Sequence, residues 1–425
     1  MTDRTAVELA PRPLRTRRPS ADASVLADLD DSRSRRLTGR PAVYLLASLI
    51  VALLASSASP TPLYAVYQAE WSFSPITTTL IFGVYALAVL GALLTLGKLS
   101  DHLGRRPVLL AAIAVQLVSL VLFATAGGVP ELLVARVVQG ISTGAALGAI
   151  GAGMLDIDRE RGTFANAVSP GIGTGSGALL SALLVRYLPA PTHLVYLVLL
   201  GVFALQALGV AMMRETVTRK PGALASLTPE IKLPRDLRVH ALAAVPALFA
   251  VWALAGLYGA LGPALVHALT GSGDAVLGAL SLTVLTATAV AAVVLLRATA
   301  AHTVMLVGML ALIAGMALTL VAVDARSTAL FFVATAVSGI GFGSGFQGGI
   351  RTVVPRAAAH QRAGLLSLLY TVSYLGLGLP AVIAGVLVVH DGGLFTTTRE
   401  YGLAVIVLAV GALGALLRAR RSAES

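Results

Sequence analysis

The chain has 425 residues, of which 57% are hydrophobic and 12% are charged, and it contains no cysteine. A soluble protein of this length needs a larger charged fraction to cover its surface, so the composition argues against a soluble enzyme. The lack of cysteine excludes disulfide bonds, thiolate catalysis and cysteine-ligated metals. The net charge of +11 does not indicate nucleic-acid binding, because the basic residues stand between apolar segments, as topology signals do.

Residues 1–40 form a polar N-terminal segment. They carry nine arginines and six acidic residues but no apolar stretch. A signal peptide needs an apolar core, so this segment is not one. Its composition is typical of a disordered cytoplasmic tail.

Beyond this tail, apolar segments follow one another, each close to the roughly twenty residues of helix that cross ~30 Å of hydrocarbon. We therefore predict an all-α membrane protein with twelve transmembrane helices. They span residues 42–66, 76–98, 107–127, 130–155, 163–187, 192–213, 240–268, 275–297, 302–323, 328–350, 363–389 and 399–418.

The longest polar stretch between the predicted helices, residues 214–239, divides them into six and six. We predict two pseudo-symmetric six-helix bundles at 41–213 and 240–418, joined by this cytoplasmic linker and followed by a cytoplasmic tail at 419–425. A weak repeat supports the duplication, because glycines recur at matched places in residues 135–144 and 334–343. Small residues there permit the close helix approach that two moving bundles need.

The placement of lysine and arginine predicts the orientation. With the N-terminus inside the cell, these residues lie on the cytoplasmic side except Arg136, which lies within a helix, and Arg186, Arg326 and Arg399. An even number of spans returns the C-terminus to the cytoplasm. We therefore predict a multi-pass protein of the cell inner (plasma) membrane with both termini cytoplasmic.

The loop after the second predicted helix reads GKLSDHLGRRP. It places the carboxylate of Asp101 at a helix end, a turn at Gly104, and the charges of Arg105 and Arg106 at the membrane face. Asp101 can contact the positive N-terminal end of a neighbouring helix. Arg105 can pair with an acid at the inner end of the fourth helix, such as Asp156. Such contacts would form in one conformation and separate in another.

This loop resembles the signature of the major facilitator superfamily, Gly-x-Leu-(Ser/Ala)-Asp-x-x-Gly-Arg-(Arg/Lys). The matching residues are Gly97, Leu99, Ser100, Asp101, Gly104, Arg105 and Arg106. The resemblance implies the twelve-helix fold of that family and a loop that latches the inner ends of the two halves in the outward-open state. We expect this latch to bring Asp101 and Arg105 near Asp156 and Arg362. An ordinary positive-inside loop is the alternative, but it needs neither Asp101 nor Gly104.

The fourth predicted helix contains Arg136-x-x-Gln139-Gly140. A buried arginine costs roughly 2.5–3.5 kcal/mol on insertion scales and normally faces a cavity. The pattern resembles the helix-4 motif of the superfamily, which in proton-driven exporters is associated with proton transfer, although Ser142 stands where that motif often has glycine. In the alternative interpretation, Arg136 snorkels to the outer interface.

The fifth predicted helix carries Pro170, Gly171 and Gly175 in a glycine-rich run. Exporters of the superfamily often have Gly-Pro-x-x-Gly-Gly in this helix, so the chain resembles bacterial drug/solute proton antiporters, but its Pro-Gly order departs from that motif. The proline predicts a kink and the glycines predict a smooth helix face. A packing role alone is equally compatible with these residues.

In the superfamily fold, helices 1, 4, 7 and 10 line the central cavity. By this resemblance, the substrate and proton pathway is predicted to include Arg136, Gln139, Tyr64, Tyr85, Trp252, Tyr258, Gln347 and Tyr374. Each aromatic residue alone is more often a packing or interface residue.

None of the twenty acidic residues falls in the middle of a predicted helix. Many cation exporters use an embedded carboxylate, because only a desolvated acid has a pKa near neutrality. The absence of such a residue disfavours a cationic substrate, and the charge of Arg136 suits neutral, polar or anionic ones. Proton carriers would then be Asp101, Asp156 or a helix-end histidine such as His240 or His267.

The sequence thus predicts a secondary active transporter that works by alternating access and exports a small neutral or anionic compound by proton-coupled efflux. Uptake or uniport of a sugar or organic acid is the alternative, and the lack of embedded acids fits a uniporter. An integral-membrane sensor or enzyme is disfavoured, because no soluble domain, metal-ligand cluster or nucleophile–base pair is visible. We predict a monomer without cofactor or metal that contacts membrane lipid, protons and a small-molecule substrate, but no nucleic acid.

Overall fold

The computed structural model describes residues 36–233, 237–358 and 361–424. Most of the predicted N-terminal tail, three residues near the end of the predicted linker (234–236), residues 359–360 and residue 425 lie outside these ranges. The α-helices in chain order are α2 (Arg40–Ala58), α3 (Pro60–Trp71), α4 (Pro75–Leu96), α5 (Leu99–Leu103), α6 (Arg105–Ala124), α7 (Val129–Ile157), α8 (Arg159–Tyr187), α9 (Pro191–Met212), α10 (Arg238–Ala260), α11 (Gly262–Thr270), α12 (Ala275–Leu295), α13 (Ala301–Asp324), α14 (Thr328–Val353), α15 (Arg362–His390) and α16 (Gly393–Glu424). Short 3₁₀ helices occur at Ala225–Leu227 (η1) and Val354–Arg356 (η3).

Within the described residues, eleven helical segments are long and apolar enough to cross a membrane, with α2 and α3 taken together as Arg40–Trp71. A further pair, Ala244–Ala260 and Gly262–Thr270, meets the same criterion jointly across a bend of 53° and gives up to twelve spans. The predicted all-α membrane fold with twelve helices is therefore confirmed.

Two predicted helices are broken in the structure, each beside a proline. The first, predicted as 42–66, breaks at Ser59, because Pro60 has no backbone N–H to continue the hydrogen-bond ladder. The seventh, predicted as 240–268, breaks between Ala260 and Gly262, where Pro263 follows at the start of α11. Both breaks lie in the first helix of a half, which is consistent with the internal repeat.

The last helix is longer than the sequence indicates. It begins at Gly393 rather than near residue 399, and it runs to Glu424 through most of the predicted tail at 419–425. Thr397 and Thr398 in its first turns are fully buried, and Thr398 Oγ1 donates to the carbonyl of Leu394 at 2.7 Å. A polar stretch that looks like a loop is helical here, because its hydroxyl groups lie inside the protein.

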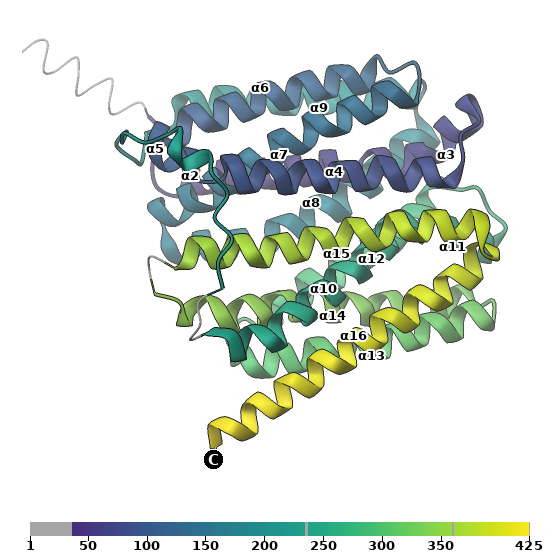
Figure 1. The fold of residues 1–425 in the computed structure, drawn as a ribbon. Coiled ribbons are helices and arrows are strands. Elements are labelled where there is room, and N and C mark those ends of the chain that lie inside the picture. Colours follow the sequence, from purple (N-terminus) through teal and green to yellow (C-terminus); the bar gives the residue numbers. More distant parts are fainter. Residues whose placement is uncertain (1–35, 234–236, 359–360, 425) are drawn as a thin grey trace, which may run out of the picture.

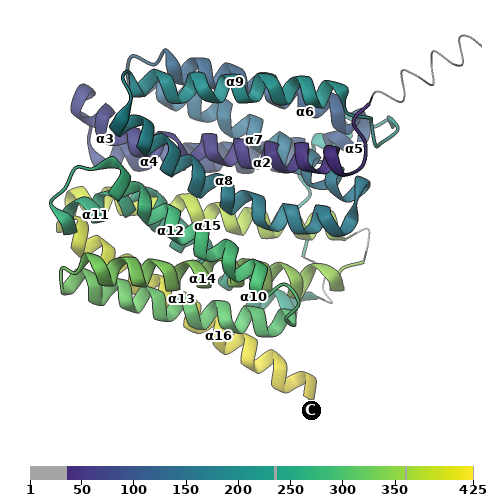
Figure 2. The ribbon, with the colours of Figure 1, turned by 180° about the vertical axis from the view of Figure 1, so that it is seen from behind.

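The helices form two halves that lie side by side. Figures 1 and 2 show α2 to α9 gathered in one half and α10 to α16 in the other. One hydrophobic core is made of residues between Ala42 and Met213, and a second is made almost entirely of residues between Ala247 and Leu416. The halves meet where α4 packs on α15 and α8 packs on α12.

The two ends of the molecule differ in what they carry. One end carries the loop between α4 and α6 and the linker, and we call it the motif end (Figure 1). The other end carries the start of α4 and α12 and the finish of α8 and α15, and we call it the opposite end.

Large apolar side chains are exposed on the outer helices, as a bilayer-facing surface requires. Leu205 and Leu208 of α9 are 71% and 64% exposed, and Val407 of α16 is 70% exposed. In water such residues would favour aggregation, whereas in lipid they match the acyl chains. The exposed faces of α9 and α16 thus support the membrane assignment independently of helix length.

Candidate functional site

The signature loop turns sharply between α4 and α6. Gly97 ends α4 and lies backbone to backbone against α7, where a Cβ on Gly148 would lie 2.7 Å from the Gly97 carbonyl oxygen. Gly104 separates α5 from α6 with φ of +101°, a conformation that residues with side chains rarely adopt. This turn starts α6 at Arg105 and aims the first N–H groups of that helix at the linker.

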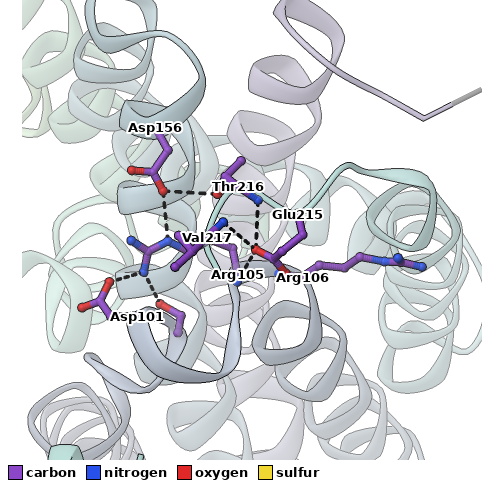
Figure 3. A network of polar contacts seen from close by, with 8 residues as sticks. Asp101, Arg105, Arg106, Asp156, Glu215, Thr216 and Val217 are labelled. Atoms are coloured by element: carbon purple, nitrogen blue, oxygen red, sulfur yellow. Dashed lines mark hydrogen bonds and ion pairs between the residues drawn. The ribbon is translucent and has the colours of Figure 1, made fainter. Parts of the chain in front are cut away.

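Arg105 is the centre of the polar network in Figure 3. The residue is 6% exposed, and its guanidinium contacts Asp101 Oδ1 at 2.5 Å, Ser100 Oγ at 2.7 Å and Asp156 Oδ2 at 3.2 Å. Asp101 lies on α5, whereas Asp156 lies in the last turn of α7. The structure thus brings three of the predicted latch residues together, and all three belong to the N-terminal half.

Glu215 completes this network, although the sequence analysis did not single it out. Its carboxylate accepts the backbone N–H of Arg105 at 2.8 Å and of Arg106 at 3.0 Å, which are two of the unpaired donors at the start of α6. It also accepts the N–H of Thr216, and Thr216 Oγ1 donates to Asp156 at 3.2 Å. A carboxylate at a helix N-terminus is favourable. One feature of the sequence could have indicated this role, since Glu215 is the first acidic residue after the sixth predicted span.

Two predicted latch residues lie outside this network. The side chain of Arg106 points away from it in Figure 3, and only the backbone of Arg106 contacts Glu215. Arg362 donates from Nε to the carbonyl oxygen of Ala357 at 3.0 Å, at the start of α15. The expected approach of Arg362 to Asp101 and Arg105 is therefore not among the contacts of the described residues.

A segment of the linker bridges the two halves at the motif end instead. Lys98, just after α4, pairs with Glu230 at 2.7 Å, and Glu230 also pairs with Lys232 at 2.9 Å. The backbone N–H of Lys232 then donates to the carbonyl of Gly364 in α15 at 3.3 Å. Hydrogen bonds from Lys98 and then Lys232 lower the pKa of Glu230 to about 2. The contribution of these pairs is present above pH 4.5 and is lost only as the pH falls toward 2, so the bridge is charged at physiological pH.

The break between α2 and α3 creates a polar site in the middle of the N-terminal half. Pro60 cannot donate to the carbonyl of Ser56, and Gln139 Nε2 donates to that oxygen at 3.1 Å instead. Gln139 Nε2 also lies 3.0 Å from Ser56 Oγ, which accepts a second bond from Gln116 at 2.8 Å. Helix α7 is thereby tied to the broken helix through side-chain amides.

Arg136 occupies this break and is 1% exposed, so it does not snorkel to the interface. Its Nη1 donates to Ser57 O at 2.9 Å and to Gln139 Oε1 at 2.7 Å. Its Nη2 and Nε donate to the hydroxyl of Tyr64 at 2.6 and 3.2 Å. No carboxylate is among these partners. Four N–H groups are used, which leaves one Nη2 N–H without a hydrogen-bond partner in the described part of the chain.

Aromatic rings surround the guanidinium of Arg136 and stabilise its positive charge. The Arg136 Cζ lies 5.2 Å from the ring centre of Tyr85, 5.7 Å from that of Phe123 and 5.8 Å from that of Tyr64. Ring faces attract a cation most strongly where water is excluded. The site therefore retains a net positive charge, because dipoles and quadrupoles satisfy the arginine without neutralising it.

The predicted pathway residues of the C-terminal half are all neutral, and their contacts fall into two separate groups. The hydroxyl of Tyr258 in α10 lies 2.9 Å from Thr319 Oγ1 and 3.5 Å from Ser338 Oγ. Trp252 packs against Tyr374 with ring centres 5.5 Å apart. Gln347 lies on α14, one residue after Phe346, which also contacts Trp252.

Six buried side-chain atoms of this half lack hydrogen-bond partners in the described part of the chain, and two of them belong to predicted pathway residues. These two are Nε1 of Trp252 and Oε1 of Gln347, one donor and one acceptor, and both are inaccessible to water. Tyr374 also packs with Tyr85 of α4 across the boundary between the halves. A run of aromatic side chains thus connects Arg136, through Tyr85 and Tyr374, to Trp252.

The glycines of α8 serve helix contact between the halves. A Cβ on Gly171 would overlap Val290 of α12, and a Cβ on Gly175 would overlap Thr286 Oγ1. Helix α8 remains one element through Pro170, from Arg159 to Tyr187. These residues therefore lie in a packing surface, and nothing about them indicates the direction of transport.

Comparison with known proteins identifies the family. The family model of the Major Facilitator Superfamily matches residues 44–302, which is more than half of the chain. The chain belongs to the Major Facilitator Superfamily. As a member it is a multi-pass secondary transporter rather than an enzyme, and proteins of the Major Facilitator Superfamily bind small-molecule substrates.

Solved structures share the fold. A crystal structure of the nucleoside transporter NupG matches with a TM-score of 0.63 at 14% identity and covers 88% of this chain and 98% of that one. A mutant form of NupG matches with a TM-score of 0.66, also at 14% identity, and covers 89% and 98%. At this identity the likeness shows the fold alone.

Glu215→Gln tests how firmly the linker anchors the signature loop. We expect the variant to lose about 0.5–2 kcal/mol of stability, because a neutral amide binds the N-terminus of α6 more weakly than a carboxylate does. Thermal unfolding of the purified protein measures this. Glu131→Gln is the matched control, since Glu131 is an exposed acid in the first turn of α7. Equal shifts in the two variants would contradict the anchoring role.

Proposed function

We propose that this transporter exports a small neutral or anionic compound by alternating access, with protons as the coupling ion. The observation that carries the proposal is the buried Arg136, which keeps its positive charge among hydroxyl, amide, carbonyl and aromatic partners. A cation placed beside it would be repelled in a medium of low dielectric constant. A neutral polar or anionic solute would instead gain a hydrogen bond from the remaining Nη2 N–H.

The C-terminal half adds complementary groups to this substrate site. Trp252 Nε1 can donate and Gln347 Oε1 can accept, and leaving both buried without partners is costly in the absence of a ligand. The rings of Tyr85 and Tyr374 connect Trp252 to Arg136. Opening of the halves along this aromatic contact would expose Arg136 on one wall and the two unpaired atoms on the other.

We assign the motif end to the cytoplasm, with both chain termini there and the protein in the plasma membrane. In this orientation the Asp101–Arg105–Asp156 network acts on the cytoplasmic side of the barrier. Protonation of Asp101 or Asp156 would weaken its hold on Arg105 and thereby couple proton binding to movement of the loop. Of the two predicted histidine carriers, His267 lies exposed at the end of α11, and the side chain of His240 lies outside the described residues.

Uptake or uniport of a sugar or organic acid is the second candidate. It is favoured by one observation, that no described aspartate or glutamate lies in the middle of a span. A carrier without an embedded acid can move a solute down its gradient without a proton. Nucleosides are suitable candidate substrates to test, since they are neutral polar solutes and a nucleoside transporter shares the fold.

Arg136→Lys and Arg136→Ala test the substrate role of the arginine. A lysine keeps the charge, but its single ammonium cannot bond Tyr64, Ser57 and Gln139 at once. We expect transport to fall at least about tenfold in both variants, since lost charge-assisted hydrogen bonds are worth about 1.5–3 kcal/mol each. Arg399→Lys, at a half-exposed ion pair with Asp324, is the control for expression and folding. Full activity in both Arg136 variants would remove the proposed role.

Flux into proteoliposomes, with and without an imposed pH gradient, tests the coupling. A panel of neutral, anionic and cationic compounds that includes nucleosides and sugars is the substrate set. We expect a neutral or anionic member to accumulate against its gradient only when the pH gradient is present. Flux that ignores the pH gradient would overturn proton coupling and establish uniport instead.

A further inference from the structure

A short backbone contact fixes the segment before α2 to the end of α9 at the motif end. Leu37 and Met213 form an isolated parallel β-bridge. The N–H of Leu37 donates to the carbonyl oxygen of Met212 at 2.9 Å, and the N–H of Arg214 donates to the carbonyl oxygen of Leu37 at 3.1 Å. The segment that precedes the first helix of the N-terminal half and the segment that follows its last helix are therefore held side by side.

Four arginines lie around this bridge, and we call them the arginine patch: Arg36, Arg40, Arg106 and Arg214. Arg36 and Arg214 belong to the two bridged segments, and Arg40 is the first residue of α2. All three are exposed. Arg106 joins them through its backbone N–H, which donates to Glu215 beside Arg214, while its side chain points away from the polar network in Figure 3.

The arginine patch lacks a counter-charge within the described part of the chain. Its side chains have no hydrogen-bond or ion-pair partner there, and Nε of Arg106 is also inaccessible to water. Arg105, Arg161 and Lys98 at the same end each pair with a carboxylate. The acid nearest in sequence to the patch, Glu215, is occupied by backbone N–H groups at the start of α6. Like charges in one place repel, so the patch favours a bound anion.

An exposed apolar surface continues from the arginine patch along α2 and α9. Tyr44, in the first turns of α2, is 63% exposed, and Leu208 and Met212 at the end of α9 are 64% and 54% exposed. The two helices touch beside these residues, because a Cβ on Gly209 would lie 2.9 Å from Cδ1 of Leu45. Tyrosine is enriched at the level of lipid headgroups. Basic groups next to an exposed apolar face match a molecule that has both a phosphate and acyl chains.

We infer that the arginine patch binds the phosphate of an anionic phospholipid whose acyl chains lie along the exposed faces of α2 and α9. Guanidinium groups bind phosphate oxygens through paired N–H bonds, and basic clusters at the ends of transmembrane helices recognise anionic headgroups. A zwitterionic lipid fits less well, because the patch repels its ammonium group. The inference does not depend on the proposed export, since it concerns the outer surface of one half rather than the substrate site.

Phosphatidylglycerol and phosphatidylcholine are the probes, and native mass spectrometry of the purified transporter in a neutral detergent measures their binding. Both lipids carry a phosphate and acyl chains, but only phosphatidylglycerol has a net negative charge. We expect it to bind at least about tenfold more tightly, because each arginine near an anionic lipid contributes about fivefold in affinity. Glycerol phosphate, which has the phosphate without acyl chains, is expected not to compete at the concentration of the lipid.

Arg40→Gln/Arg214→Gln removes two charges of the arginine patch whose side chains contact nothing that the fold needs. We expect the affinity for phosphatidylglycerol to fall about ten- to thirtyfold in this variant and that for phosphatidylcholine to stay unchanged. Arg40→Lys/Arg214→Lys keeps the charge and is expected to retain most of the affinity. Arg297→Gln/Arg356→Gln is the matched control, since both residues are exposed arginines at the motif end of the other half. It is expected to bind as the wild type does.

Any of four results would overturn the lipid site. Equal affinities of the wild-type protein for the two lipids would show that charge does not select the occupant. An unchanged affinity in Arg40→Gln/Arg214→Gln, or an equal loss in the control variant, would show that phosphatidylglycerol does not bind at the arginine patch. Competition by glycerol phosphate would show that the patch takes a soluble phosphate rather than a lipid.

Discussion

A buried guanidinium group inside a membrane protein needs partners for its donors and its charge, and the centre of this protein is built around that requirement. Arg136 finds its partners because Pro60 breaks the first span and the chain beside it offers carbonyl oxygens. Gln139 Oε1 accepts a hydrogen bond from Arg136, and Gln139 Nε2 donates to the carbonyl oxygen of Ser56, which Pro60 leaves without a backbone donor. The broken helix and the arginine therefore depend on each other, and neither is stable alone in hydrocarbon.

The two halves repeat this architecture with different chemistry. Each begins with a helix that breaks beside a proline, and each places a tyrosine hydroxyl against the fourth helix of its half. In the N-terminal half that hydroxyl binds Arg136, whereas in the C-terminal half Tyr258 reaches Ser338. The N-terminal half thus buries a positive group, whereas the neutral residues Trp252 and Gln347 of the C-terminal half bury an unpaired donor and an unpaired acceptor. This asymmetry is the physical basis for expecting neutral or anionic solutes.

The fold was predictable from the sequence because a bilayer imposes strong rules on helix length and charge placement. The pairing of Arg105 with Asp156 was predictable because both residues lie at helix ends that the topology brings to the same end of the molecule. The breaks in the first and seventh helices were not predicted, since transmembrane helices often contain prolines without breaking. Glu215 was missed because its role depends on which helix terminus lies beside it, which apolar periodicity does not encode.

Ligand binding by a charge-matched series tests most directly the claim that a positive centre without acids selects the substrate. The series needs one scaffold in anionic, neutral and cationic forms, with affinity measured on purified protein at constant ionic strength. We predict that the cationic form binds at least about tenfold more weakly than the neutral form, and that Arg136→Gln removes this difference. A cationic form that binds the wild-type protein as tightly as the neutral form would contradict the claim.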